Sequence, residues 1–173
     1  IKKKSFFKLY NLKKLNFFSN SIESIEEGFQ DLFLMNELDL DNNLLEYVSN
    51  TFLKGFDNIS VLKLCNNKIY MIKDYSFYFL RNLKRLDLNN NLIYYISNSS
   101  LTYLNFLEYL DLQNNKINDL DKRSFNDLIN LKFLFLGFNK IKILHEFLFE
   151  NLYNLTQLNL NQNQISKIHY RSF

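Results

Sequence analysis

The sequence predicts an α/β solenoid, in which short parallel strands stack along one face and irregular turns return along the other. The first observation is an asparagine that recurs at an interval of 23 residues and then of 24. The second is a pair of leucines, spaced two apart, ahead of each asparagine. The third is a set of apolar columns that follows each asparagine at irregular spacing. A fixed period of this length indicates a repeat array, because no catalytic motif recurs in that way.

The leucine pairs predict the strands. Leu86 and Leu88 precede Asn91 as Leu110 and Leu112 precede Asn115, and a spacing of two places both side chains on one side of a strand. Strands repeated one unit apart can pair only in parallel, so each unit must carry the chain back. The two strand columns are Leu15/Leu38/Leu62/Leu86/Leu110/Leu134/Leu158 and Phe17/Leu40/Leu64/Leu88/Leu112/Leu136/Leu160.

The returning leg contains several apolar columns and then one rich in phenylalanine. Because their spacing is irregular, we expect turns and 3₁₀ segments there, with little regular α-helix. The phenylalanine column comprises Phe77, Phe125, Phe149 and Phe173, with Leu53 and Leu101 as substitutes and Phe29 displaced by one.

The chain is predicted to be a single array over residues 1–173. It comprises a partial repeat at 1–11, six full repeats starting at 12, 35, 59, 83, 107 and 131, and a partial repeat at 155–173. Neither end shows the polar or cysteine-bearing cap that shields a terminal repeat. We therefore expect the chain to be an excerpt of a longer array.

The unit Leu86-x-Leu88-x-x-Asn91-x-Ile93 resembles the leucine-rich repeat family in its typical 24-residue form. The 24-residue length and the phenylalanine column are similar to those of Toll-type receptor, Slit-like and small proteoglycan ectodomains. The resemblance implies a curved horseshoe with the parallel sheet on its concave face. It also implies an asparagine ladder that bonds to buried backbone groups in the turns, formed by Asn20, Asn43, Asn67, Asn91, Asn115, Asn139 and Asn163.

Composition argues against several other classes of function. The net charge of +3 has no concentrated basic face, so we expect no nucleic-acid partner. No apolar run is long enough for a transmembrane segment. With one cysteine, two histidines and three glycines, the chain shows no nucleophile beside a base, no phosphate loop and no metal-ligand spacing. We expect no enzymatic activity, no cofactor and no metal.

The resemblance implies that partners bind to outward positions of the concave sheet. The sixth unit places Phe133, Phe135 and Phe138 there, with Tyr109 in the preceding strand. Such an aromatic cluster has the composition of a binding hot spot, although codon bias toward phenylalanine would also explain it. The other candidate contacts are the polar outward residues Asp39, Lys63, Asp87 and Asp111. The acidic ones favour a basic partner or simply keep the face soluble.

We therefore predict a non-catalytic recognition array of an extracellular or cell-surface protein that binds a protein ligand. The alternatives are a cytoplasmic scaffold or adaptor, and a targeting module fused to an enzyme. Candidate N-glycosylation sites occur at Asn58, Asn98 and Asn154, a number that the abundance of asparagine alone accounts for. A homodimer could form through the concave face or through a lateral tyrosine run, Tyr47, Tyr70, Tyr94 and Tyr95.

Overall fold

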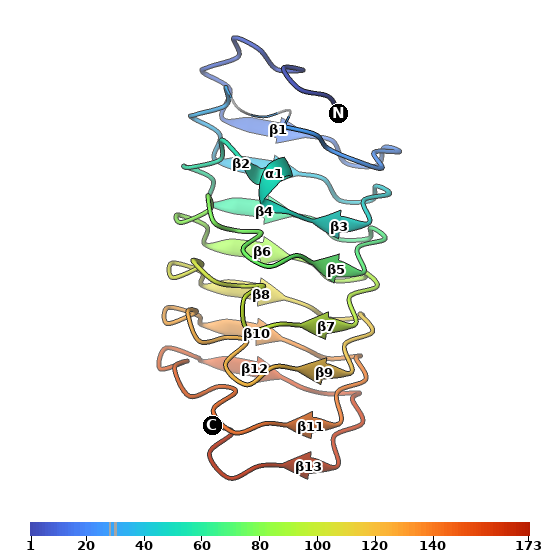
Figure 1. The fold of residues 1–173 in the computed structure, drawn as a ribbon, viewed down its shortest axis with the longest axis vertical. Helices are drawn as coiled ribbons and strands as arrows, with labels where there is room; N and C mark the ends of the chain where they lie inside the picture. Colours follow the sequence, from blue (N-terminus) through green and yellow to red (C-terminus); the bar gives the residue numbers. More distant parts are fainter. Residues whose placement is uncertain (28, 30) are drawn as a thin grey trace.

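The computed structural model describes residues 1–27, 29 and 31–173, and in it the units stack along the long axis of the molecule (Figure 1). Seven three-residue strands form one parallel sheet. In spatial order they are β1 (Lys14–Asn16), β2 (Glu37–Asp39), β4 (Val61–Lys63), β6 (Arg85–Asp87), β8 (Tyr109–Asp111), β10 (Phe133–Phe135) and β12 (Gln157–Asn159).

The register of this sheet follows the repeat. Leu62 of β4 lies opposite Leu86 of β6, which lies opposite Leu110 of β8. Each central leucine therefore points inward above its equivalent in the next unit, and the predicted parallel solenoid is confirmed.

The returning leg contains short parallel pairs that the sequence did not predict. They join β3 (Tyr47–Val48) to β5 (Met71–Ile72), β7 (Tyr95–Ile96) to β9 (Asp119–Leu120), and β11 (Ile143–Leu144) to β13 (Lys167–Ile168). One four-residue helix, α1 (Asn50–Leu53), follows β3. In the described residues the expected 3₁₀ segments are replaced by turns with isolated bonds, such as Leu83 N to Leu80 O at 3.0 Å. This bond does not extend into a helix because the next N–H, that of Lys84, donates instead to the Ser60 carbonyl of the preceding unit at 2.9 Å.

The core is a continuous apolar column enclosed by the sheet and the returning leg. Phe125 stacks on Phe149 with ring centroids 5.9 Å apart, and Phe149 stacks on Phe173 at 5.3 Å. At the other end Phe29 packs at 4.8 Å against Phe56, which follows the column position Leu53 by three residues. The phenylalanine column is thus built from separate stacks, because leucines occupy the same column in the second and fourth units.

The recurring asparagines join consecutive units. The Asn91 side-chain amide donates to the carbonyls of Leu64, Leu88 and Asn89 at 2.9–3.3 Å. Its Oδ1 accepts from the Ile69 N–H at 3.0 Å. Two of these partners belong to the preceding unit and two to its own unit, so one side chain satisfies both turns. Asn43, Asn67, Asn115, Asn139 and Asn163 repeat this arrangement, whereas the exposed Asn20 bonds only to carbonyls of its own turn.

Two further hydrogen-bonding columns run along the array. Buried serines on the returning leg donate to a carbonyl of the preceding unit: Ser76 to Val48, Ser100 to Ile72, Ser124 to Ile96 and Ser172 to Leu144. Asparagines before the strands, exposed or half-buried, do the same: Asn58 to Phe33, Asn82 to Asp57, Asn130 to Asn105 and Asn154 to Ile129. Each of these polar columns links neighbouring units independently of the core.

Candidate binding face

We call the outward side of the seven-stranded sheet the concave face. Its aromatic cluster consists of Tyr109 on β8 and Phe133 and Phe135 on β10, which are adjacent strands. The Tyr109 ring centroid lies 5.3 Å from that of Phe135 and 6.2 Å from that of Phe133. Phe133 remains 37% exposed, and the other two side chains are half-buried. The cluster is therefore a packed apolar surface whose outer side is open to solvent.

Phe138 lies in the turn after β10, in a backbone conformation that suits asparagine better. Its φ is +55°, in the left-handed region, where Asn42, Asn66, Asn90 and Asn114 stand in other units. A phenylalanine there is strained, because its Cβ crowds the following carbonyl. The side chain is 48% exposed. An exposed apolar residue in this strained conformation does not stabilise the fold, which makes Phe138 a candidate for a binding role.

Gly137, which stands between Phe135 and Phe138 in the sequence, does not open the backbone to a ligand. A Cβ at this position would overlap the Oδ1 atom of Asn161, and Gly137 is itself buried. The glycine instead gives room to the Asn161 side chain of the next unit. A ligand that approaches the sheet at this point would therefore contact the phenylalanine rings and not the Gly137 backbone.

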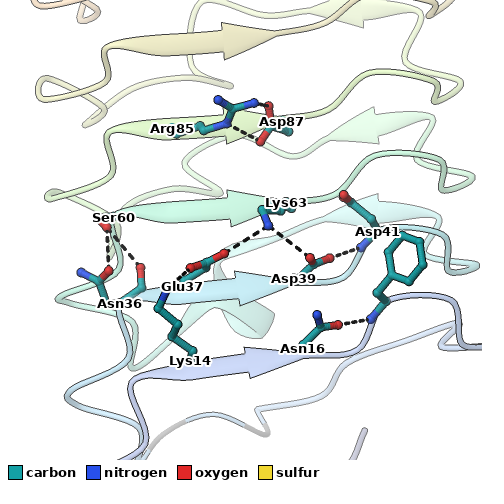
Figure 2. Close-up of polar contacts among 11 residues, drawn as sticks. Lys14, Asn16, Asn36, Glu37, Asp39, Asp41, Ser60, Lys63, Arg85 and Asp87 are labelled. Atoms are coloured by element: carbon teal, nitrogen blue, oxygen red, sulfur yellow. Dashed lines mark hydrogen bonds and ion pairs between the residues drawn. The ribbon is translucent and has the colours of Figure 1, made fainter.

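Arg85 extends the aromatic cluster by one strand, a contact that the sequence did not reveal. Its guanidinium lies over the Tyr109 ring, 4.0 Å from the centroid. The same guanidinium forms two hydrogen bonds to Asp87, at 2.8 and 3.0 Å. Figure 2 shows this pair on β6. Asp87 thereby holds the Arg85 guanidinium over the Tyr109 ring. Arg85, Tyr109 and the phenylalanines form a continuous surface across three strands.

Asp39, Asp87 and Asp111 differ from the expectation of exposed acidic contacts. They are buried, with 9%, 4% and 8% of their surface exposed. Asp39 Oδ1 accepts from the Asp41 N–H at 3.1 Å, and Asp111 Oδ1 accepts from the Gln113 N–H at 3.0 Å. Asp39 and Asp111 thus stabilise the turn after their strands, while Lys63 pairs with Asp39 and Arg85 pairs with Asp87.

Lys63 is the remaining polar candidate on the concave face. Its Nζ lies 3.1 Å from Glu37 and 3.3 Å from Asp39, and Lys14 reaches Glu37 at 2.7 Å (Figure 2). The hydrogen bonds from Lys14 and Lys63 lower the pKa of Glu37. This end of the concave face is therefore a network of matched charges, while the aromatic cluster offers an apolar surface.

Replacing Asp111 with asparagine should raise stability at neutral pH. Burial raises the pKa of Asp111, so its ionised form is disfavoured in the folded state. Asn16 and Asn159 already hold the equivalent bond, at 2.7 and 2.9 Å, so an amide fits the position. The folded protein holds the proton to higher pH than the unfolded chain, so the wild type loses stability as pH rises through that interval.

Urea melts of the two proteins across a pH series test this expectation. The advantage of the Asp111→Asn variant should be greatest at pH 7 and disappear by about pH 3, because the unfolded aspartate, with a pKa of about 3.9, is protonated there as well. A variant that is less stable at pH 7, or a difference that is constant with pH, would contradict it.

Cys65 is a thiol shielded from reaction. Its Sγ lies 2.7 Å from Asn89 Oδ1, and Asp41 accepts from its N–H at 2.6 Å. Burial and then the charges of Asp41 and Asp87 raise the pKa of the Cys65 thiol far above its usual range. The thiolate is the reactive species, so alkylation by iodoacetamide at pH 8 should be at least about tenfold slower in the native protein than in urea. Intact-mass measurements would show this, and equal rates would contradict it.

The candidate glycosylation and lateral residues lie away from the concave face. Asn58, Asn98 and Asn154 are all exposed. In the tyrosine run Tyr47, Tyr70 and Tyr94 are 39–49% exposed. Tyr95 hydrogen-bonds to Asp121, which raises the pKa of Tyr95 to about 12. The run is therefore partly engaged in contacts within the chain.

The repeat geometry matches the model of a known family. The leucine-rich repeat model matches residues 57–117 and 106–165. The chain belongs to the leucine-rich repeat family. A search of curated proteins finds no match. In the described part of the chain, no helix has the length and apolar character needed to cross a membrane.

Solved leucine-rich repeat structures are similar over most of this chain. One is the protein LIC12759 of Leptospira interrogans, with 32% identity and a TM-score of 0.80, covering 91% of this chain and 39% of that one. Another is a chain of the TLR13–ssRNA13 complex, with 27% identity and a TM-score of 0.79, covering 95% and 22%. A third is a chain of the Toll–Spatzle complex of Drosophila, with 26% identity and a TM-score of 0.74, covering 84% and 22%. This chain thus spans between about a fifth and two fifths of their lengths.

Proposed function

We propose that this leucine-rich repeat array is a non-catalytic recognition module that binds a protein ligand on its concave face, as part of an extracellular or cell-surface protein. The observation that carries the proposal is the surface formed by Arg85, Tyr109, Phe133 and Phe135. Stacked arginine and aromatic side chains are the residues that dominate binding energy at protein interfaces. Leucine-rich repeats are typical protein-interaction modules, and the similar chain from the Toll–Spatzle complex supports an extracellular setting.

Charge pairing on the concave face favours a protein over an RNA ligand. Strong binding of single-stranded nucleic acid needs basic side chains that are available to phosphates, together with stacking rings. Here Lys14 and Lys63 pair with Glu37, Arg85 pairs with Asp87, and Lys132 lies 2.7 Å from Glu108. The rings are present, whereas these cations are already paired. A similar chain occurs in a complex with ssRNA, so RNA is included in the test.

Removing the aromatic surface tests the proposal. The Phe133→Ser/Phe135→Ser variant should lose at least about tenfold in capture of a cross-linked protein partner from the source organism, because it removes central aromatic anchors. The thermal melt should fall only slightly, since Phe133 is exposed and the half-buried Phe135 lies on the outer side of the sheet, away from the core. Phe106→Ser is the matched control, because Phe106 is 57% exposed and lies before β8, outside the sheet.

Two results would contradict the proposal. One is equal capture by the wild type and the double variant, which would place the contact elsewhere on the array. The other is saturable binding of labelled single-stranded RNA that the double variant loses while protein capture persists.

The proposed location has its own test, the enzymatic removal of N-glycans from the protein isolated from its native cells. A mass shift at Asn58, Asn98 or Asn154 requires passage through the secretory pathway, so such a shift is the expected result.

A further inference from the structure

A second aromatic cluster lies on the turns of the returning leg, away from the concave face. It combines Tyr75, Tyr78 and Phe79 of one unit with Tyr103 of the next. Tyr78 meets Tyr103 edge-on, with ring centroids 5.0 Å apart, and meets Phe79 edge-on at 5.1 Å. Tyr75 is tilted toward Tyr103 at 6.4 Å. Tyr75 and Tyr78 are 50% and 41% exposed, so part of each side chain remains open to solvent.

Hydrogen bonds to neighbouring units fix the backbone that carries two of these rings. The Tyr75 N–H donates to the Ser99 carbonyl of the next unit at 3.0 Å. The Tyr103 N–H donates to the Asp127 carboxylate of the unit after that, also at 3.0 Å. The cluster is thus fixed across three consecutive units, and a ligand would pay little to order it.

Two adjoining hollows share the wall formed by Tyr78 and Phe79. One, of about 440 Å³, is completed by Asn50, Tyr75 and Tyr103, and its lining is mainly apolar. The other, of about 430 Å³, is completed by Asp57, Arg81 and Asn82. An occupant that extends over the shared wall would therefore have an apolar part in the first hollow and a polar part in the second.

The charge of Arg81 decides which polar group fits. Its guanidinium lies 5.2 Å from the Tyr78 centroid and 5.7 Å from the Tyr103 centroid. In the described residues it forms no ion pair, although Asp57 lines the same hollow. A cation already lies over these ring faces, so a second cation is disfavoured and a carboxylate is favoured.

We propose that this cluster binds an extended, proline-containing segment of a partner protein that carries an acidic side chain beside its prolines. Proline-rich segments dock in aromatic-lined grooves because their polyproline II conformation is formed in advance. Their backbone carbonyls have no internal partners, so tyrosine hydroxyls can donate to them. This sequence contains no proline, so a second copy of it cannot supply such a segment. The site is separate from the concave face and does not depend on the function proposed there.

Fluorescence anisotropy with a labelled peptide tests the proposal. The probe is a Pro-Pro-Glu repeat of about twelve residues, whose three-residue period places all glutamates on one side. We expect saturable binding, and Tyr78→Ala and Arg81→Gln should each weaken its affinity by at least about tenfold. The wild-type protein should bind a Pro-Pro-Lys peptide at least about tenfold more weakly than the Pro-Pro-Glu peptide. Tyr153→Ala is the matched control, because Tyr153 is 79% exposed and lies outside both hollows.

Several results would overturn the proposal. They are no saturable binding of the Pro-Pro-Glu peptide, equal binding by the Tyr78→Ala protein, and equal binding of the lysine peptide or of an Ala-Ala-Glu peptide. Sedimentation velocity without peptide could give a further contradicting result. If the wild type self-associates and Tyr78→Ala abolishes this association, the cluster is a contact between copies of the chain. Arg81→Gln keeps an exposed polar side chain, so the charge test remains valid if the tyrosine variant unfolds.

Discussion

Replacing Leu112 with alanine is expected to lower the free energy of unfolding by about 2–5 kcal/mol, the range for leucine-to-alanine changes in a packed core. Leu112 is fully buried between the sheet and the returning leg. Its N–H donates to Phe135 at 2.8 Å, and its carbonyl accepts from Asn115 and Asn139 at 3.1 and 2.9 Å. These backbone bonds hold the site in place, so the cavity cannot collapse and the cost should lie toward the upper end.

Urea melts of the variant and the wild type would measure this change. Leu92→Ala is the matched control, because Leu92 is 38% exposed while its N–H donates to Ile69 at 2.8 Å. An exposed substitution of this kind should cost within about 0.5 kcal/mol. Equal destabilisation by the two changes would contradict the core that the repeat pattern defines.

Replacing Asn91 with alanine is expected to cost about 1–3 kcal/mol, the penalty for a buried donor left without a partner. Asn91 is 5% exposed. The carbonyls of Leu64 and Leu88 each keep a second amide donor, from Asn67 and Asn115 at 3.2 and 3.0 Å. The Ile69 N–H depends on Asn91 Oδ1, so most of the cost should come from that one group.

Hydrogen exchange distinguishes this local cause from general destabilisation. The Ile69 amide should exchange faster in the Asn91→Ala protein by more than the change in global stability accounts for. Asn105→Ala serves as the control, because Asn105 is an exposed asparagine before a strand. An unchanged urea midpoint for Asn91→Ala would show that the amide column contributes nothing to stability.

The parallel sheet could be predicted because its cause is local and repeated. Leu62, Leu86 and Leu110 stand one unit apart, and that spacing alone dictates that they lie opposite one another. The paired strands β3–β5, β7–β9 and β11–β13 could not be predicted in the same way. They contain two residues each, and they form because the core columns already bring the returning legs to hydrogen-bonding distance.

The candidate site was harder to predict than the fold. Period-two alternation places Asp87 and Asp111 on the outward side of the sheet, but it does not show that backbone and basic groups cover them. The contact of Arg85 with Tyr109 joins two units and depends on side-chain conformation. By contrast, the sequence contains a signal for the column of Ser76, Ser100 and Ser124, although this column was not predicted. These serines recur at the repeat period, immediately before the phenylalanine column.

Site-specific photo-cross-linking tests the central claim most directly. A benzophenone amino acid would replace Phe135 on the concave face in one protein and the exposed Tyr153 in another. Irradiation with proteins of the source organism should give a discrete adduct from position 135 that excess unlabelled array competes away, and none from position 153. A competed adduct from position 153 without one from position 135 would contradict recognition through the concave face.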